Sequence, residues 1–233
     1  MITAKGSEVK DHISNSDLKI KDEYISLKEG QSIKVRVLGA DDYVEYMSHG
    51  AYNLDIFTQP CPNPQACDCV YCKAGKAGVE GFEVLKAKPR YLFAFANIET
   101  GKIMLLDVSK NQAKKLMAGI DKYAKNIGNV AFTLDRVGSG KDTAYTLNPI
   151  LGMEPAEQTA FDKFNGVTVD VDFFINRLEI RIPSEDFKVK MLSQAGFPVE
   201  EYKNTFGAEL VEKALASTDE DATRVEESPE DVI

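Results

Sequence analysis

All four cysteines of the chain lie within twelve residues, at positions 61, 67, 69 and 72. Residues 1–24 contain no apolar core of a secretion signal, and no stretch approaches the roughly 20 apolar residues of a membrane span. We therefore expect a cytoplasmic protein, in which disulfides do not persist. Grouped thiols in a reducing compartment are typical of metal ligands. The cluster thus predicts that a metal ion organises this part of the fold.

Cys69 and Cys72 form a CxxC pair, whose spacing lets two thiolates converge on one tetrahedral ion. Cys61 or Cys67 supplies a third ligand, and His49 can supply the fourth. This mixture of thiolate and imidazole favours a structural Zn²⁺ with no open position for a substrate. The predicted set is His49, Cys61, Cys69 and Cys72, with Cys67 as the alternate, and the four cysteines alone are the rival set. A redox CxxC usually lies at a strand-to-helix junction, whereas this one is expected in a Pro/Gly-rich loop. An iron–sulfur cluster would need all four cysteines despite the tight spacing of 67 and 69, and four unrelated thiols would not crowd into twelve residues.

The net charge of −9 is spread unevenly along the chain. Residues 217–233 hold seven acidic residues against one arginine, so this segment alone carries −6. We predict a polar N-terminal arm at 1–22, a folded core at 23–216 and a disordered acidic tail at 217–233. Because most of the excess acid lies in the tail, the core is able to carry a basic groove.

Hydrophobic periodicity predicts short strands and a few helices. The strand at 32–38 has Ile33, Val35 and Val37 on one face, with Lys34 and Arg36 forming a basic outer face. Hairpins are expected at 91–108 and 131–147, and a further strand at 168–174. A capping box at 109–112 opens a helix that ends near residue 128, and further helices are predicted at 154–164 and 199–216. Residues 49–78 show no period and are predicted to form an insertion held by something other than an apolar core.

This pattern indicates an α+β fold, mainly β, in which a small barrel carries a zinc-binding insertion at about 49–78 and peripheral helices. An OB-fold is one such barrel and commonly binds oligonucleotides. Periodicity alone does not select it over other α+β arrangements.

One order of motifs resembles a known family. A basic strand (IKVRVLG), His49, a lone cysteine and the Asp68–Cys72 knuckle are followed by KPRYLFAFANIETGKIMLLDVSKNQAKKL. This order, from about Tyr24 to Tyr145, is similar to that of phage single-stranded DNA-binding proteins of the T-even helix-destabilising type. Departures from the family are the extra Cys67, an N-terminal arm without a short basic Lys/Arg–Ser/Thr cluster, and a tail that ends on Ile233 rather than on an aromatic residue.

The resemblance implies an OB-fold core, a zinc subdomain with one His and three Cys ligands, and an acidic C-terminal tail. It also implies a function: coating and protecting single-stranded DNA, without sequence preference, during phage DNA replication, recombination and repair in the host cytoplasm. The tail would recruit replication or recombination proteins and compete with DNA for the basic groove. Self-association on DNA stays an open possibility, because the N-terminal arm lacks the basic cluster that the family uses for cooperative binding. No membrane partner is expected.

Sequence-tolerant binding of single strands requires cations that follow the phosphates and aromatic side chains on which bases stack. Residues of both kinds lie on or beside the predicted strands. The DNA-binding set comprises Lys34, Arg36, Tyr43, Tyr46, Lys86, Lys88, Arg90, Tyr91, Lys102, Arg136 and Lys141. Phe93 and Phe95 share a strand face with Tyr91, and we expect both phenylalanines to be core residues.

The sequence contains no catalytic motif, and we expect no enzymatic activity. Residues 138–141 read GSGK but lack the full phosphate-binding loop, and no Ser/His/Asp grouping is present. Asp170 and Asp172 are better explained by strand alternation than as the metal ligands of a nuclease. The alternatives are therefore a zinc-containing adaptor or transcription-type factor and, less well supported, a metal-dependent nuclease.

Overall fold

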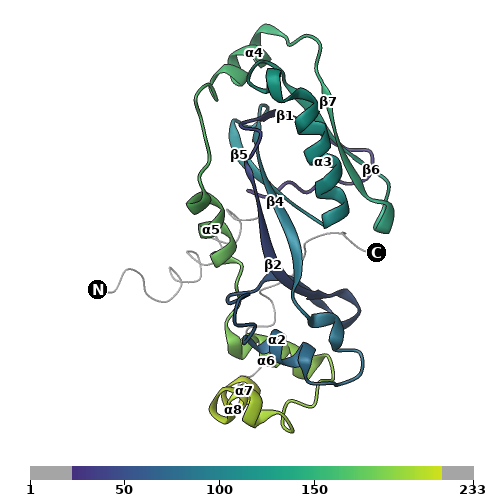
Figure 1. Cartoon of the computed structure of the whole chain (residues 1–233), viewed down its shortest axis with the longest axis vertical. Coiled ribbons are helices and arrows are strands. Elements are labelled where there is room, and N and C mark those ends of the chain that lie inside the picture. The colour runs from purple at the N-terminus through teal and green to yellow at the C-terminus, as the bar shows by residue number, and fades with distance from the viewer. Residues whose placement is uncertain (1–22, 217–233) are drawn as a thin grey trace, which may run out of the picture. The chain divides into compact units, whose positions relative to one another are not determined.

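The computed structural model describes residues 23–216 and shows an α+β fold. The predicted arm at 1–22 and the predicted tail at 217–233 lie outside the described residues. Seven strands form one mostly antiparallel sheet in the order β3-β2-β4-β1-β6-β7, and β5 pairs with β4 (Figure 1). The end strands β3 and β7 are not neighbours in this order, so the sheet is open, and its pairing does not close the predicted barrel.

The described chain divides into two compact units. Unit 1 contains residues 23–44 and 91–171, and unit 2 contains residues 45–90 and 172–216. Strands β2 (Tyr43–Ala51) and β4 (Lys88–Asn97) have residues in both units. The single predicted core of 23–216 is therefore two units, each with its own apolar cluster.

Unit 1 is built from the hairpins that the sequence predicts. β1 (Ser32–Val37) pairs with both β4 and β6 (Phe132–Val137), β4 pairs with β5 (Lys102–Val108), and β6 pairs with β7 (Ala144–Pro149). Helix α3 (Lys110–Tyr123) begins at the predicted capping box and continues as the 3-10 turn η3 (Ala124–Asn129). The turn η4 (Gly140–Asp142) joins β6 to β7, and α4 (Pro155–Asp162) begins with the predicted N-terminal proline.

The core of unit 1 lies between the sheet and α3. Phe93 and Phe95 are buried in it, which confirms their expected role as core residues. On α3, Ala113, Leu116 and Ile120 are buried against the same cluster. The opposite side of β4, with Leu92, Ala94 and Ala96, is buried as well, so neither face of this strand segment is open to a ligand.

Unit 2 shows that residues 49–78 are not an irregular insertion. They contain the 3-10 turn η1 (Tyr52–Leu54), strand β3 (Ile56–Pro60) and helix α2 (Val70–Lys76), followed by η2 (Glu83–Leu85). The prediction that this segment lacks an apolar core is wrong. Side chains of α2 pack in one cluster with residues of α6 (Glu185–Gln194) and α8 (Ala208–Ala216), which lie more than 100 residues later in the chain. A contact at that separation leaves no local signal in the sequence.

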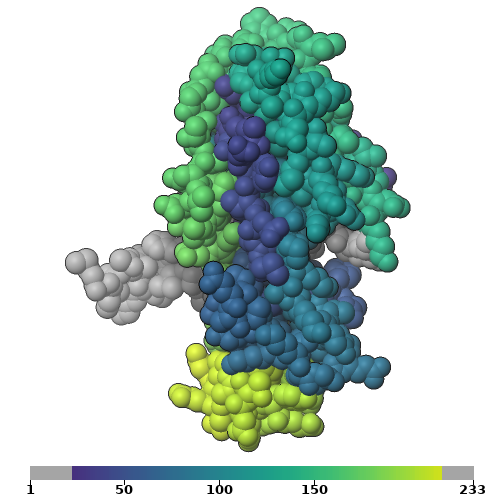
Figure 2. Space-filling model, in the orientation of Figure 1, coloured from purple at the N-terminus to yellow at the C-terminus, as the bar shows by residue number. Residues whose placement is uncertain are grey.

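Two further elements of unit 2 differ from the expectation. Residues 168–174 do not form a strand, because helix α5 occupies Val171–Ile180. The run fits a helix equally well, since Phe174 is buried and the Arg177 guanidinium lies 3.6 Å from the Phe173 ring centroid, one helical turn away. The predicted helix at 199–216 is two helices, α7 (Lys203–Phe206) and α8, separated by Gly207 at φ +107°. Together α7 and α8 form the yellow body in Figure 2.

Candidate metal centre

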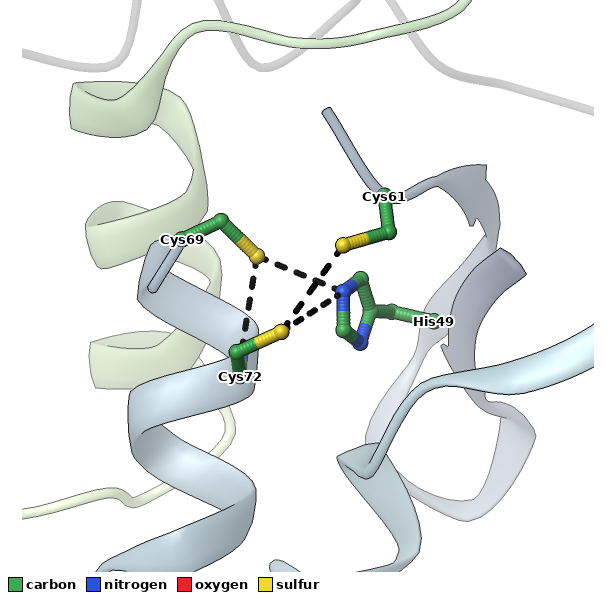
Figure 3. Close-up of side chains that lie close together, drawn as sticks. All are labelled: His49, Cys61, Cys69 and Cys72. Carbon is green, nitrogen blue, oxygen red and sulfur yellow. Dashed lines mark hydrogen bonds between the residues drawn. The ribbon is translucent and has the colours of Figure 1, made fainter. Parts of the chain in front are cut away.

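Two neighbouring structures in unit 2 supply the four predicted ligands. His49 lies in β2 opposite Gln59 of β3, and Cys61 directly follows β3. The Cys61 amide donates to the Met47 carbonyl at 2.8 Å, which extends the β2–β3 pairing past Pro60. Cys69 is the N-cap residue of α2 and Cys72 lies in its first turn. The hairpin and the helix N-terminus thus direct four side chains toward one point (Figure 3).

The spacing of the donor atoms fits a tetrahedral ion. The ligand atoms of His49, Cys61, Cys69 and Cys72 all lie within 4.8 Å of one another. His49 Nε2 is 3.3 Å from Cys69 Sγ and 3.6 Å from Cys72 Sγ, and the Sγ atoms of Cys61 and Cys72 are 3.7 Å apart. Zn–S bonds of about 2.3 Å and a Zn–N bond of about 2.0 Å imply tetrahedron edges of about 3.5–3.8 Å. These three separations are close to the edges of a His/Cys₃ tetrahedron.

All four side chains are buried, with exposures of 1% for His49, 7% for Cys61, 5% for Cys69 and 2% for Cys72. A site closed in this way leaves no coordination position for a substrate, as in structural rather than catalytic zinc sites. Among residues 23–216, this is the only group of three or more His, Cys, Asp or Glu side chains close enough to hold a metal ion.

A hydrogen bond fixes the orientation of the imidazole. His49 Nδ1 lies 2.7 Å from the Leu85 carbonyl oxygen, to which it donates its proton. With a metal bound, this bond would leave the lone pair of the neutral ring on Nε2, the atom that faces the three sulfurs. Leu85 is fully buried at the end of η2. The sequence carries no signal that would have singled out Leu85, because its contribution is a backbone oxygen.

The three ligand thiols differ in their acidity. Burial raises the pKa of the Cys69 thiol. Hydrogen bonds with His49 and with the Cys72 amide lower this pKa by more than burial raises it, and the resulting value is about 7. Burial and the neighbouring Cys69 sulfur raise the pKa of both Cys61 and Cys72. One thiolate is therefore available near neutral pH, and the other two thiols must release their protons to solvent when a metal binds.

Helix α6 supports the start of α2 through a carboxylate. Glu185 Oε2 accepts a hydrogen bond from the Val70 amide at 2.8 Å, and its Oε1 lies 2.5 Å from the ammonium of Lys188. Lys188 has no exposed surface, whereas the Glu185 side chain is 40% exposed, so the pair joins a buried ammonium to a carboxylate at the surface of unit 2. The pairing fixes the first turn of α2, which carries both cysteines of the CxxC. The Ser184 N-cap could have indicated α6 in the sequence, but not this contact.

Cys67, the alternate ligand, lies outside the group of four. Its backbone is in the left-handed region at φ +51°, and its thiol donates to the Pro64 carbonyl at 3.0 Å, away from the cluster. The side chain is partly exposed. The expectation that the CxxC lies in an irregular loop is wrong in one respect, because its second half forms the first turn of α2.

Two arginines of the predicted DNA-binding set are buried in hydrogen bonds. Arg36 is 6% exposed and donates to the carbonyls of Phe161 and Gly128 and to Asn165 Oδ1. Its guanidinium also lies 4.2 Å from the Phe161 ring centroid. Arg136 is likewise 6% exposed and donates to the Leu27 carbonyl. The basic outer face predicted for β1 is wrong for Arg36, because α4 and the residues after it cover that face.

The remaining predicted DNA-binding residues vary in exposure. Lys34 forms an ion pair with Glu157 of α4, Tyr43 packs against Phe93 with ring centroids 5.0 Å apart, and Tyr46 is buried. The structure divides the other six by exposure: Lys86, Lys88, Lys102 and Lys141 are exposed, and Arg90 and Tyr91 are partly buried. The structure therefore leaves four predicted cations open to solvent and does not gather the eleven residues into one group.

Asp170 and Asp172, which the sequence places on a strand, lie at the start of α5.

No helix in the part of the chain that the structure describes is long and apolar enough to cross a membrane. Comparison with known proteins adds no relative, since no family model and no curated protein match the chain.

Proposed function

We propose that this chain is a sequence-nonspecific single-stranded DNA-binding protein whose His49, Cys61, Cys69 and Cys72 side chains hold a structural Zn²⁺. The observation that carries the proposal is the buried His/Cys₃ group with tetrahedral spacing. Its ligands occur in the chain order His, Cys, CxxC, which is the order that the resemblance to T-even type phage proteins rests on.

Zinc is the metal that best suits these donors. Three thiolates and one imidazole are soft to intermediate ligands, and Zn²⁺ accepts them in the tetrahedral arrangement that the distances require. An iron–sulfur cluster held by four cysteines would need Cys67, whose thiol is directed to the Pro64 carbonyl instead. A closed zinc site supplies folding free energy and no chemistry, so we propose no enzymatic activity.

The sheet of unit 1 is the proposed OB-fold. Strands β5, β4, β1, β6 and β7 are five antiparallel neighbours, and α3 lies between β5 and β6 in the chain. OB-folds are partly open five-stranded barrels that bind oligonucleotides, which supports this assignment. In the proposed role the protein coats single strands in phage replication, recombination and repair inside the host cell, and its acidic tail recruits partner proteins.

Binding to an unstructured single strand tests the function. Purified protein should bind fluorescein-labelled oligo(dT) with an affinity that falls steeply with salt, and should bind a duplex of the same length far more weakly. A zinc-containing adaptor shows no such preference, and a nuclease degrades the strand when Mg²⁺ is added. Equal affinity for the two DNA forms, or no binding to either, overturns the proposal.

Replacing individual ligands tests the metal centre. Metal analysis of the purified protein should find one zinc per chain. Cys67→Ser should keep the full zinc content, whereas His49→Ala should bind zinc far more weakly, because its removal leaves three ligands. Zinc loss in Cys67→Ser together with full retention in His49→Ala would show that the ligand set is wrong.

A further inference from the structure

Helix α3 is the most cationic element of the described chain. Residues 109–125 contain five lysines against one aspartate, a net charge of +4 in a protein whose total is −9. All five side chains are exposed. We define the α3 lysine face by these residues: Lys110, Lys114, Lys115 and Lys122 of α3, and Lys125 of η3.

The periodicity of the helix places these lysines opposite the core. Ala113, Leu116 and Ile120 point into the apolar cluster of unit 1. At 100° per residue, Lys114, Lys115 and Lys122 fall on the far side, around the small exposed residue Ala118. Four lysines then lie along about 18 Å of helix, without a bulky side chain in the middle of the face. Such a surface can follow several successive phosphates.

None of these lysines is paired with a carboxylate within residues 23–216. Ion pairs there hold other lysines, among them Lys34, Lys188 and Lys203, and the one contact of the face is that of Lys122 with the Tyr123 ring at 5.1 Å. Ammonium groups that pair with no carboxylate are available to neutralise phosphates, and release of the cations condensed on the DNA then drives binding.

A predicted DNA-binding residue lies next to this surface. Gln112 Nε2 donates to the Thr143 carbonyl at 3.2 Å, which holds the β6–β7 turn against the first turn of α3. Lys141, in that turn, is exposed. The Arg36 and Arg136 guanidinium groups, by contrast, are buried in hydrogen bonds and cannot reach phosphates. Six exposed lysines of unit 1 thus lie on α3, on η3 and in the neighbouring β6–β7 turn.

We infer that the α3 lysine face binds the phosphate backbone of single-stranded DNA. The inference rests on the proposed function and names a surface for it that differs from the strand surface that the sequence predicts. Contact by ammonium groups alone carries no base specificity, since lysine acts on a phosphate as a point charge. The face therefore contributes affinity and salt dependence, and base stacking must come from aromatic residues elsewhere.

The test compares two triple variants of the full chain with equal charge change. The face variant is Lys114→Gln, Lys115→Gln and Lys122→Gln, and the control is Lys28→Gln, Lys163→Gln and Lys203→Gln, all at exposed positions. Affinity for fluorescein-labelled oligo(dT) is measured by anisotropy between about 50 and 200 mM salt. Each lost phosphate contact lowers the slope of log affinity against log salt by about 0.7, so the face variant should lose about 2 from the wild-type slope. The control should keep the slope.

Two further measurements separate charge from folding. A variant with arginine at the same three face positions should restore the wild-type slope, because the positive charge is kept. Lysine acetylation followed by mass spectrometry should show that oligo(dT) protects Lys114, Lys115 and Lys122 but not Lys163. An unchanged slope in the face variant, or equal protection at Lys163, overturns the inference while the proposed function stands. If the wild-type chain does not bind oligo(dT), the proposed function fails and the inference fails with it.

Discussion

Cys69 differs from Cys61 and Cys72 in the direction of its pKa shift. Its hydrogen bonds with His49 and the Cys72 amide outweigh burial and lower its pKa to about 7, whereas burial raises the pKa of both other thiols. A depressed pKa stabilises the folded state above the ordinary thiol value, and this contribution is lost as pH falls through the folded value. In the metal-free protein, therefore, Cys69 is the thiolate of the site at pH 8 and a thiol at pH 6.

Ultraviolet titration of the metal-free protein checks this assignment, because thiolates absorb where thiols do not. We expect one ionisation with a midpoint near pH 7. The same step should be absent in Cys69→Ser and present in Cys67→Ser. A titration in which Cys69→Ser and the wild-type chain coincide between pH 6 and pH 8 would contradict the proposed order of ionisation.

We predict that Arg36 contributes to the stability of the fold rather than to DNA binding. Its guanidinium donates to the Phe161 and Gly128 carbonyls and to Asn165, and a lysine in its place cannot reproduce this planar arrangement. Arg36→Lys should lower the free energy of unfolding by about 2 kcal/mol or more, since buried acceptors lose their donor. Urea denaturation measures the change, and Lys141→Gln, at an exposed position, should stay within about 0.5 kcal/mol of wild type. An unfolding free energy of Arg36→Lys equal to that of wild type would show that these bonds do not hold α4 to β1.

At the scale of elements, the metal centre depends on how closely α2 approaches η2. A Cβ atom on Gly75 would lie 2.8 Å from the Lys86 amide nitrogen and 3.1 Å from the Leu85 carbonyl carbon. The Leu85 carbonyl also orients His49, so displacing this backbone displaces a metal ligand. Gly75 thus sets the distance between the helix that carries two ligands and the segment that orients a third.

Gly75→Ala should therefore destabilise the protein, by about 1–3 kcal/mol, because the added methyl group overlaps backbone that cannot move freely. Its zinc affinity should fall as well. Gly119→Ala is the matched control, since a Cβ there would meet Leu147 at an ordinary 3.8 Å and alanine favours α3 by up to about 1 kcal/mol. Thermal unfolding and zinc competition with a chelating dye measure both effects. Equal behaviour of the two variants would disprove the proposed close approach.

Local signals account for the elements that the sequence predicts correctly. Alternation identified β1, turn residues identified both hairpins, and the capping box at Ser109 marked the start of α3. Alternation says that Arg36 points away from Val35 and Val37 but not what packs on that side, so the cover provided by α4 was missed. A short apolar run fits the period of a strand and that of a helix equally well, which explains why the strand predicted at 168–174 was wrong.

The sequence predicts which types of side chain bind the metal better than it predicts which individual residues do. Crowded cysteines and one nearby histidine indicate a metal, and the structure groups the four favoured residues. Cys67 is excluded only by three-dimensional detail, namely the β2–β3 register that brings Cys61 near His49 and the left-handed backbone that turns Cys67 toward Pro64. Neither feature has a signature in the spacing of the cysteines.

For the whole molecule, the proposed metal site and the proposed DNA-binding surface belong to different units with separate cores. The four candidate ligands belong to unit 2, and the α3 lysine face belongs to unit 1. In the proposed function, zinc binding contributes folding free energy to the residues that surround the ligands, so we expect its removal to act first on unit 2. The acidic residues 217–233 carry the opposite charge to the α3 lysine face and, in the proposed function, compete with DNA for it.

Deleting Ser217–Ile233 should tighten binding to oligo(dT). The segment carries a charge of −6, so its removal ends an electrostatic competition for the same lysines. We expect a gain of about tenfold at low salt that vanishes as salt screens both interactions. A full-length variant in which the seven acidic residues become Asn and Gln separates charge from length and should reproduce the gain. In the face variant with glutamine at 114, 115 and 122, the same deletion should have a smaller effect, because the acidic tail and the DNA would bind the same surface. An affinity at low salt that neither the deletion nor the neutralised tail changes would exclude this competition.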